Sequence, residues 1–544
     1  MFILAIVAII VILMILLRVR GKKAAEVTPE KKTEEPKQVA EPKQAAAELK
    51  QEVKQEPSFR FLAEEDVLTI HPGTQCILTP SWKMEFGEEN LAGIRRVKIG
   101  EGISFLGIGA FDGWKTLTEV ELPESVTRIG SKAFNRCTGL RHITMPDSVS
   151  AIGKESFYGC STLTDLRIPG GLEIIAQDAF RECTGLKEII IPEGVTTLEK
   201  GAFLGCTGLT RIYIPASTTA MEIIGTGWET FRGCYGIQEF VVAEGNPVYS
   251  TRDGILFDRE QKTLLQYPKG RQGACRVPEG VETIADQAFS GCQGLTAVEL
   301  PASVIRIGNK AFEKCERLEQ VTSDGGKISL GTGVFAFCTA LKEAPLLRHT
   351  ASIPGSLFSG CTALQSVVIP EGITRIGDNA FYGCKALISA QVPDDLEIIE
   401  KNAFAKCEAL AEVRLPEGLR EIGMGAFGGC TALQELKIPG SVAAIGGTAF
   451  RGCTGLRSVE IGYGVKTIGG SAFADCTGLT QLQIPDSVVT IETQAFLNIP
   501  HIIYHGPATA DPKDPIYIAM FRGYSEYISG NTWGAKLRNE DILP

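Results

Sequence analysis

The chain has 544 residues, 44% of them hydrophobic, and a formal net charge of -10 at pH 7. Lys and Arg are interspersed with Asp and Glu, so the sequence contains no basic stripe that could follow a phosphate backbone. Nucleic acid is therefore not an expected partner.

The N-terminus carries an uninterrupted apolar run, residues 1–17, followed directly by two Arg and two Lys. A helix of this length spans about 25 Å, enough to cross a bilayer if the arginines reach the interface. A cleaved signal peptide has basic residues before its apolar run and a small-residue site after it, and the chain shows neither. We expect residues 1–20 to be a retained transmembrane anchor.

The basic residues also predict the side of the membrane on which the rest of the chain lies. Because Lys and Arg follow the apolar run and none precedes it, the positive-inside rule favours the cytoplasm for everything after residue 17. A position at the cell surface is the alternative. Residues 21–58 are rich in Lys, Glu, Ala and Pro and contain no aromatic residue, which predicts a disordered tether.

Residues 59–93 carry apolar side chains, among them Phe61 and Ile70, in no repeating register. They precede a long repeat region, 94–505, whose terminal coil would otherwise expose an apolar face. We interpret 59–93 as an N-terminal cap.

The repeat region is defined by a phenylalanine that recurs every 23 residues with two exceptions. The sixteen positions are Phe111, Phe134, Phe157, Phe180, Phe203, Phe231, Phe289, Phe312, Phe335, Phe358, Phe381, Phe404, Phe427, Phe450, Phe473 and Phe496. The interval is 28 residues after Phe203 and 58 after Phe231. A fixed period of this length predicts a solenoid.

One repeat contains two kinds of apolar spacing. Ile143 and Met145 alternate as in a strand, and Pro146 cannot donate a ladder hydrogen bond and so ends that strand. The short segment from Phe157 to Cys160 suits about one helical turn. We expect a repeat solenoid of about sixteen coils, mainly β with short helical turns, in which each coil buries its apolar side chains against its neighbours.

Fourteen cysteines follow a ladder phenylalanine by three residues. The same slot holds Trp114 in the first repeat and Ile499 in the last, and these substitutes share only apolar character. We expect buried free thiols that pack as small hydrophobic groups. The repeat has no Cys-x-x-Cys, and the five His occupy no common repeat position, so neither a metal nor another cofactor is predicted.

Complete repeats, such as Cys183-Thr184-Gly185-Leu186 through Ala202-Phe203, combine Cys-Thr-Gly-Leu, Ile-Pro and Ala-Phe. This form resembles the BspA-like, bacterial surface-antigen type of leucine-rich repeat. The resemblance covers about 94–505 and implies an interaction or adhesion surface, commonly outside the cell. It is specific for the fold and weak for function, because a scaffold defines that family.

Two stretches depart from the repeat. The insertion, about 244–277, has two apolar runs around a polar segment and predicts a β-hairpin that projects from the solenoid. This block also resembles one that recurs in the BspA-like family, so both a structural elaboration and a functional element remain open. Residues 318–354 match the repeat worst, with Pro345 at a strand position, which predicts local softness or a bend. Residues 506–544 are expected to form a C-terminal cap or tail.

The outward positions of the main strands form a second ladder, most of it polar. Three neighbouring coils place Ile190, Tyr213 and Val241 there, next to the insertion. An apolar cluster with a charged rim predicts a partner site, and the rim residues are Lys187, Glu188, Arg211 and Glu239. The alternative is that the hairpin folds back and covers the cluster.

No catalytic arrangement is recognisable in the sequence. Gly423–Gly428 fits Gly-x-Gly-x-x-Gly, but its glycines belong to the repeat and no long helix follows. Our first hypothesis is therefore a membrane-tethered, non-enzymatic scaffold that binds a protein partner through the strand face. The alternative is an exported adhesin that binds a host or matrix protein or a glycan. The sequence makes no prediction about oligomeric state.

Overall fold

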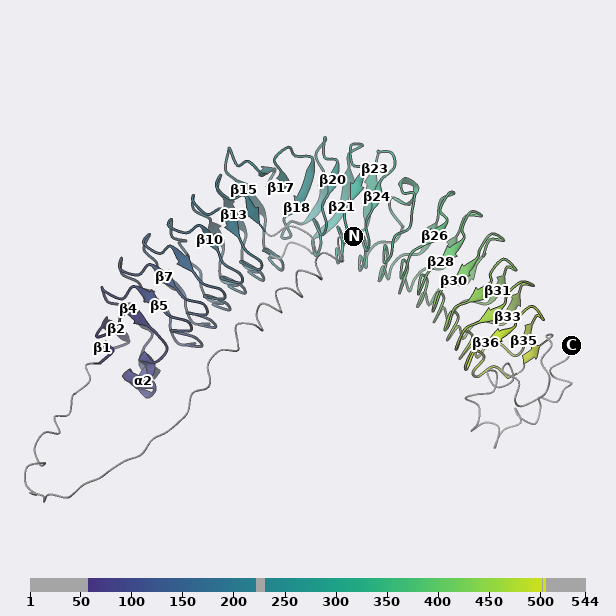
Figure 1. Cartoon of the computed structure of the whole chain (residues 1–544). Coiled ribbons are helices and arrows are strands. Elements are labelled where there is room, and N and C mark those ends of the chain that lie inside the picture. Colours follow the sequence, from purple (N-terminus) through teal and green to yellow (C-terminus); the bar gives the residue numbers. More distant parts are fainter. Residues whose placement is uncertain (1–56, 222–229, 501, 505–544) are drawn as a thin grey trace, which may run out of the picture. The chain divides into compact units, whose positions relative to one another are not determined.

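The computed structural model describes residues 57–221, 230–500 and 502–504 of the chain. It shows a β-solenoid whose successive coils lie side by side (Figure 1). The predicted fold class is confirmed, with a period close to 23 residues. The proposed anchor, the tether and the C-terminal tail lie outside the described residues.

Most coils contribute one main strand and one shorter, minor strand. The main strands are β4 (Arg96–Ile99), β6 (Glu119–Glu121), β8 (His142–Thr144), β11 (Glu188–Ile190), β13 (Arg211–Ile214), β15 (Glu239–Val242), β19 (Gly273–Arg276), β21 (Leu295–Leu300), β23 (Gln320–Ser323), β25 (Ser366–Val368), β27 (Ser389–Gln391), β29 (Glu412–Val413), β31 (Glu435–Ile438), β33 (Ser458–Ile461), β35 (Leu482–Ile484) and β37 (Ile502–Tyr504).

The minor strands have two residues each. They are β3 (Ile77–Leu78), β5 (Phe105–Leu106), β7 (Arg128–Ile129), β9 (Ala151–Ile152), β10 (Ile174–Ile175), β12 (Thr197–Leu198), β14 (Ala220–Met221), β20 (Thr283–Ile284), β22 (Arg306–Ile307), β24 (Ser329–Leu330), β26 (Arg375–Ile376), β28 (Ile398–Ile399), β30 (Glu421–Ile422), β32 (Ala444–Ile445), β34 (Thr467–Ile468) and β36 (Thr490–Ile491).

Parallel pairing places equivalent residues of neighbouring coils opposite each other. Val97, Val120 and Ile143 are successive Cα partners on β4, β6 and β8, and all three are buried. The residues beside them in each strand point outward, because side chains alternate across a strand. The apolar alternation in the sequence therefore becomes a continuous column of core side chains along the solenoid.

The phenylalanine ladder is a stack of parallel rings. The rings of Phe111 and Phe134 lie 5.0 Å apart with an interplanar angle of 2°. The surrounding segments are hydrogen-bonded turns rather than helices, because Lys132 and Arg136 adopt left-handed backbone conformations, with φ of 60° and 55°. The N–H of Phe134 donates to the carbonyl of Ser156 in the next coil at 2.7 Å, so the turns bond between coils as the strands do.

The repeat cysteines are free and buried, as predicted. Their thiols also have a specific partner, since each of thirteen donates to the carbonyl of a ladder phenylalanine 26 or 31 residues earlier. The Sγ of Cys160, for example, lies 3.1 Å from the carbonyl oxygen of Phe134. The thiol thus fills an apolar slot and joins two coils.

Residues 59–93 contain three strands, β1 (Phe59–Glu64), β2 (Val67–Pro72) and the minor strand β3, together with the short helix α2 (Trp82–Phe86) and the 3₁₀ helix η1 (Glu88–Gly93). β1 and β2 are antiparallel, and β2 pairs with β4 of the first coil. The indole of Trp82 is buried against Phe111 and donates from Nε1 to the carbonyl of Ala110 at 2.9 Å. This segment therefore closes the apolar end of the first coil.

In the described part of the chain, no helix has the length and apolar character required to cross a bilayer.

The expected projecting hairpin is instead built into the stack of coils. β16 (Tyr249–Arg252), β17 (Ile255–Asp258) and β18 (Thr263–Gln266) form an antiparallel meander, and β18 pairs with the minor strand β20. Neighbouring residues of β17 face different cores: Leu256 packs with the coils before the insertion and Phe257 with those after it. The meander does not project because its apolar side chains alternate between these two cores.

Tyr267 continues the aromatic ladder where phenylalanine is missing. Its ring stacks on Phe289 at 4.8 Å between centroids, whereas the ladder before the insertion ends at Phe231, which meets Phe240 edge-on at 5.9 Å. The 58-residue interval between Phe231 and Phe289 therefore contains one further aromatic residue of the ladder, Tyr267.

The coil between β23 and β25 is irregular, at the place where the repeat pattern is weakest. It has no main strand but contains η2 (Leu347–His349), preceded by Leu346 in a left-handed conformation with φ of 62°. The main sheet β19-β21-β23 stops here and a new one, β25-β27-β29, begins. The predicted disturbance is thus an interruption of the main sheet.

Candidate functional site

The three predicted apolar residues of the strand face lie on adjacent main strands. Ile190 of β11 is the Cα partner of Tyr213 in β13, which in turn is the partner of Val241 in β15. Ile190 is 66% exposed, while Tyr213 and Val241 are half-buried. Parallel pairing therefore brings the predicted residues together, with Ile190 as the most accessible member.

The charged rim is organised around Arg211. Its guanidinium forms ion pairs with Glu239 and with Glu188, the latter at 3.5 Å, and its Nη1 lies 3.2 Å from the Tyr213 hydroxyl. It also lies 5.9 Å from the centroid of the Tyr213 ring. The hydrogen bond to Tyr213 and then the one to Glu239 raise the pKa of Arg211, so its charge is maintained. These contacts hold the Tyr213 ring in place.

Lys187 is the rim residue that the ion pairs do not include. Its side chain is exposed, and it has no ion pair among the described residues. Its backbone carbonyl accepts hydrogen bonds from the N–H and the hydroxyl of Thr210, at 2.7 and 3.0 Å. Lys187 therefore offers an unpaired positive charge at the edge of the strand face.

The insertion lies beside this face. The N–H of Phe240 donates to the carbonyl of Gly254 at 2.9 Å, so the turn between β16 and β17 adjoins β15 at its edge. Arg271 anchors that turn, with bonds to the carbonyls of Gln238 and Asp253 at 2.7 and 2.6 Å. The meander thus borders the coil of Val241, and Ile190, two strands away, remains exposed.

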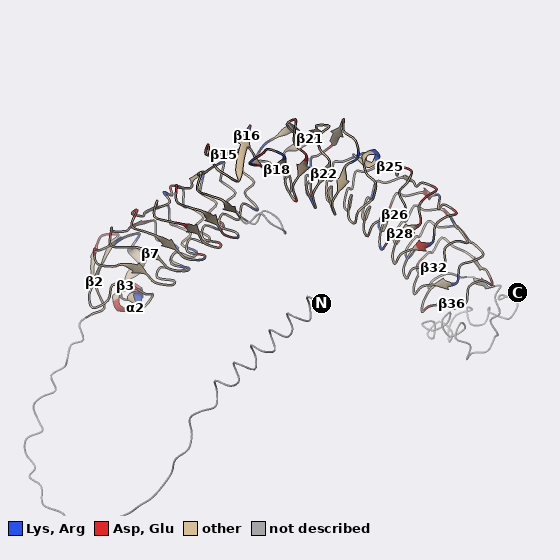
Figure 2. Ribbon diagram, turned by 45° about the horizontal axis from the view of Figure 1, so that its top comes forward, with Lys and Arg blue, Asp and Glu red and all other residues tan. Residues whose placement is uncertain are grey.

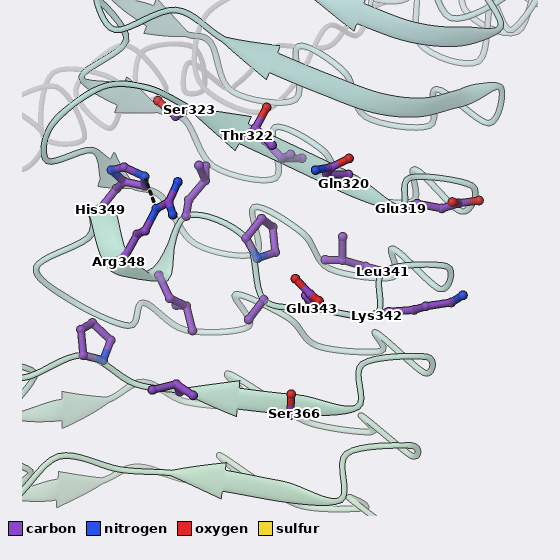
Figure 3. Close-up of a pocket in the computed structure, with 17 residues that line it drawn as sticks. Glu319, Gln320, Thr322, Ser323, Leu341, Lys342, Glu343, Arg348, His349 and Ser366 are labelled. Atoms are coloured by element: carbon purple, nitrogen blue, oxygen red, sulfur yellow. Dashed lines mark hydrogen bonds between the residues drawn. The ribbon is translucent and has the colours of Figure 1, made fainter.

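A second candidate is a hollow of about 780 Å³ at the irregular coil (Figure 3). It lies between β23, which carries Gln320 and Thr322, and β25, which carries Ser366. Val368, 60% exposed, and Pro345 add apolar surface to the lining. The volume lies within the range of roughly 300–1,000 Å³ that is typical of ligand pockets.

Charged side chains of both signs line this hollow, namely Glu319, Lys342, Glu343 and Arg348. Nε of Arg348 donates to Nε2 of His349 at 2.9 Å, and Nδ1 of the same ring lies 3.0 Å from the carbonyl oxygen of Gly326. Because arginine can only donate, Nε2 accepts and the ring proton lies on Nδ1. Neither Glu319 nor Glu343 forms an ion pair with another described residue.

Elsewhere on the coils, basic and acidic residues are interspersed (Figure 2). Many pair across one coil, such as Lys98 with Glu121 at 3.0 Å and Lys385 with Glu408 at 2.9 Å. Over residues 57–221, 230–500 and 502–504 no three His, Cys, Asp or Glu side chains are grouped in a way that could hold a metal ion.

Comparison with known families agrees with the repeat geometry. A model described as "BspA type Leucine rich repeat region (6 copies)" matches residues 104–244, 272–388 and 374–503. The chain belongs to the BspA-type leucine-rich repeat family. Proteins of this family are typically interaction proteins or surface adhesins and typically lack enzymatic activity. No curated protein matches the chain.

Several solved structures are similar to this BspA-type chain. A leucine-rich repeat protein from Eubacterium ventriosum has 23% sequence identity and a TM-score of 0.47, covering 68% of this chain and 92% of its own. A leucine rich cell surface protein from Faecalibacterium prausnitzii has 26% identity and a TM-score of 0.39, covering 74% and 93%. A leucine-rich repeat protein from Bacteroides ovatus has 24% identity and a TM-score of 0.40, covering 83% of this chain and 99% of its own. Because these three TM-scores are below 0.5, the fold assignment rests on the family match and on the coils of the structure itself.

The sequence reasoning did not identify the hollow as a candidate site. Its sequence signal was present, because Pro345 and Val368 interrupt the polar outward ladder on two neighbouring coils and the repeat pattern fails between 318 and 354. That failure predicted a bend but not a cavity. The cavity follows from the loss of one main strand, which sequence periodicity does not describe.

Proposed function

We propose that this BspA-type chain is a non-enzymatic scaffold that binds a protein partner through the strand face of β11, β13 and β15. The proposal rests mainly on the strand register, which aligns Ile190, Tyr213 and Val241 and leaves Ile190 66% exposed. Apolar anchors surrounded by charged residues are typical of the energetic centre of a protein interface. The unpaired charge of Lys187 would contribute to orientation and to association rate.

A substitution on this face tests the proposal. Ile190→Glu places a charge at the most exposed anchor and should remove a cross-linked or co-purified partner, with binding weakened at least tenfold. Ile388→Glu is the matched control, because Ile388 is 57% exposed on a distant coil. The pair Tyr213→Glu and Tyr463→Glu repeats the comparison, since Tyr463 is 76% exposed. Equal partner binding by all four variants would contradict the proposed face.

The proposal includes tethering to a membrane by residues 1–20, with the repeats in the cytoplasm. It is supported by the apolar run 1–17 and the basic residues directly after it. The alternative is an exported adhesin, which the surface-antigen type of the family favours. Cysteine introduced into 21–58 and labelled with a membrane-impermeant maleimide on intact cells separates the two. Protection from label is expected for the tethered scaffold, and labelling from outside would favour the adhesin.

A further inference from the structure

β23 is an edge strand inside the solenoid. Its residues pair with β21 on one side, in the register Val298 to Val321, but no strand follows on the other side. The chain of the irregular coil instead lies against β25, where Glu343 forms an isolated bridge with Ser366. The main-strand ladder is therefore interrupted between two regular sheets, at the hollow.

Pro345 explains this interruption. It occupies the position that holds Gln391 and Tyr213 in other coils, whose carbonyls accept a bond from the preceding coil, such as Ile369 N–H to Gln391 at 2.9 Å. In a strand, the N–H of a residue points to the same side as its carbonyl. Proline has no N–H, so residue 345 cannot complete the ladder towards β23.

The edge of β23 that lines the hollow has unused backbone groups, although the residues Val321 and Ser323 are themselves largely buried. By register, the N–H and carbonyl of Val321 and the N–H of Ser323 face the hollow, because Thr322 between them faces β21. Within the described chain, no backbone hydrogen bond is formed from these groups towards the irregular coil. An edge of this kind is a template for pairing with another extended chain.

Side chains of both charges line the hollow, and Glu343 lies between Lys342 and Arg348. Figure 3 shows Glu343 between β23 and the strand that carries Ser366, and its carboxylate forms no ion pair with a described residue. Glu319 adds a second unpaired carboxylate at the start of β23. Pro345 and Val368 supply apolar contacts on either side. A single basic side chain at the centre of an extended segment would meet the unpaired carboxylate of Glu343, whereas Lys342 and Arg348 favour neutral or acidic groups beside it.

We propose that the free edge of β23 binds an extended peptide segment of a partner protein as an added strand, with a Lys or Arg of that segment directed at Glu343. Backbone hydrogen bonds to Val321 and Ser323 would provide affinity, and the carboxylate would provide selectivity. This site is separate from the strand face at Ile190, and it gives the scaffold a second, peptide-binding surface.

The test uses the full chain and a fluorescein-labelled nonapeptide, Ser-Thr-Val-Thr-Lys-Thr-Val-Thr-Ser, followed by fluorescence anisotropy. A peptide of the same sequence with N-methyl groups on residues four and six lacks two backbone donors and should bind at least tenfold more weakly. A peptide with Glu in place of the central Lys should also bind at least tenfold more weakly. Equal binding of the N-methylated peptide overturns strand addition, and equal binding of the Glu peptide overturns the role of Glu343.

Two variants locate the binding. Glu343→Lys should reverse the preference between the Lys and Glu peptides, whereas the control Glu435→Lys, on exposed β31, should not. Pro345→Thr restores the missing N–H and should close the edge, lowering affinity for the Lys peptide at least tenfold. Unchanged preference in Glu343→Lys overturns the site even if Pro345→Thr fails to fold. Ile190→Glu should leave peptide binding unaltered, which separates this test from that of the strand face.

Discussion

The thiol of Cys361 donates a hydrogen bond to the carbonyl oxygen of Phe335, at 3.1 Å between Sγ and O, and so joins two neighbouring coils. The same carbonyl accepts the N–H of Cys338, so it keeps one partner if the thiol is removed. The repeat cysteine is thus both a core side chain and a cross-coil donor, which accounts for its recurrence beyond simple apolar packing.

Cys361→Ala should lower the free energy of unfolding by about 1–2 kcal/mol, because one buried hydrogen bond is lost and a small cavity remains. Urea denaturation followed by circular dichroism measures the change. Cys76→Ala is the control, since Cys76 is exposed and should alter stability by less than about 0.5 kcal/mol. A loss no larger in Cys361→Ala than in the control would show that the thiol bond contributes nothing measurable.

Burial also predicts a loss of stability at alkaline pH. Desolvation raises the pKa values of Cys137, Cys361 and Cys407 from 9.0 to about 12. Below about pH 9 the thiols are protonated in both states, and above it the unfolded chain releases protons that the folded chain retains. The urea midpoint should therefore fall as pH rises from about 9 towards 12. Cys361→Ala should flatten this slope, and a midpoint that is constant up to about pH 11 would contradict the argument.

Gly254 should be intolerant of a side chain. Its φ is 68°, and an added Cβ would lie 2.7 Å from the Cβ of Glu239. Gly254→Ala should destabilise the chain by at least about 1 kcal/mol more than Gly245→Ala, which shares the left-handed backbone, with φ of 89°, but has no atom within 4 Å of the added methyl. Differential scanning calorimetry compares the two. Equal unfolding temperatures would mean that the insertion can move away from β15.

The N-terminal cap should depend on the indole of Trp82. Trp82→Phe removes the Nε1 bond to Ala110 and part of the contact with Phe111, so we expect a loss of about 2 kcal/mol. Protection of the first coils in hydrogen exchange should fall with it. Met84→Ala, at a side chain 77% exposed on the same helix, is the control and should have little effect.

Much of the fold could be predicted because a strict period repeats the same local information. Phe134 and Phe157 occupy equivalent positions in a 23-residue unit, and stacking the units places their rings 5.1 Å apart. The same logic predicted the alignment of Ile190, Tyr213 and Val241, since parallel strands pair equivalent residues. Periodicity carries no information about which of the three remains exposed.

Departures from the period were less predictable. Tyr267 precedes Phe289 by 22 residues and follows an antiparallel meander, so its place in the aromatic ladder depends on how β18 docks on β20. The meander itself was expected to project, because alternating apolar residues do not reveal that Leu256 and Phe257 face two different cores.

The solenoid, its period and the burial of the Phe and Cys ladders could be predicted from the sequence, because each depends on local alternation repeated many times. The thiol partners, the path of the insertion and the interruption beside β23 became known from the three-dimensional structure. Those features depend on contacts between coils. The missing N–H of Pro345, for example, leaves β23 without a partner, although β23 lies 22 residues or more before it in the chain. Contacts of that kind become visible only when the neighbouring coils are in place.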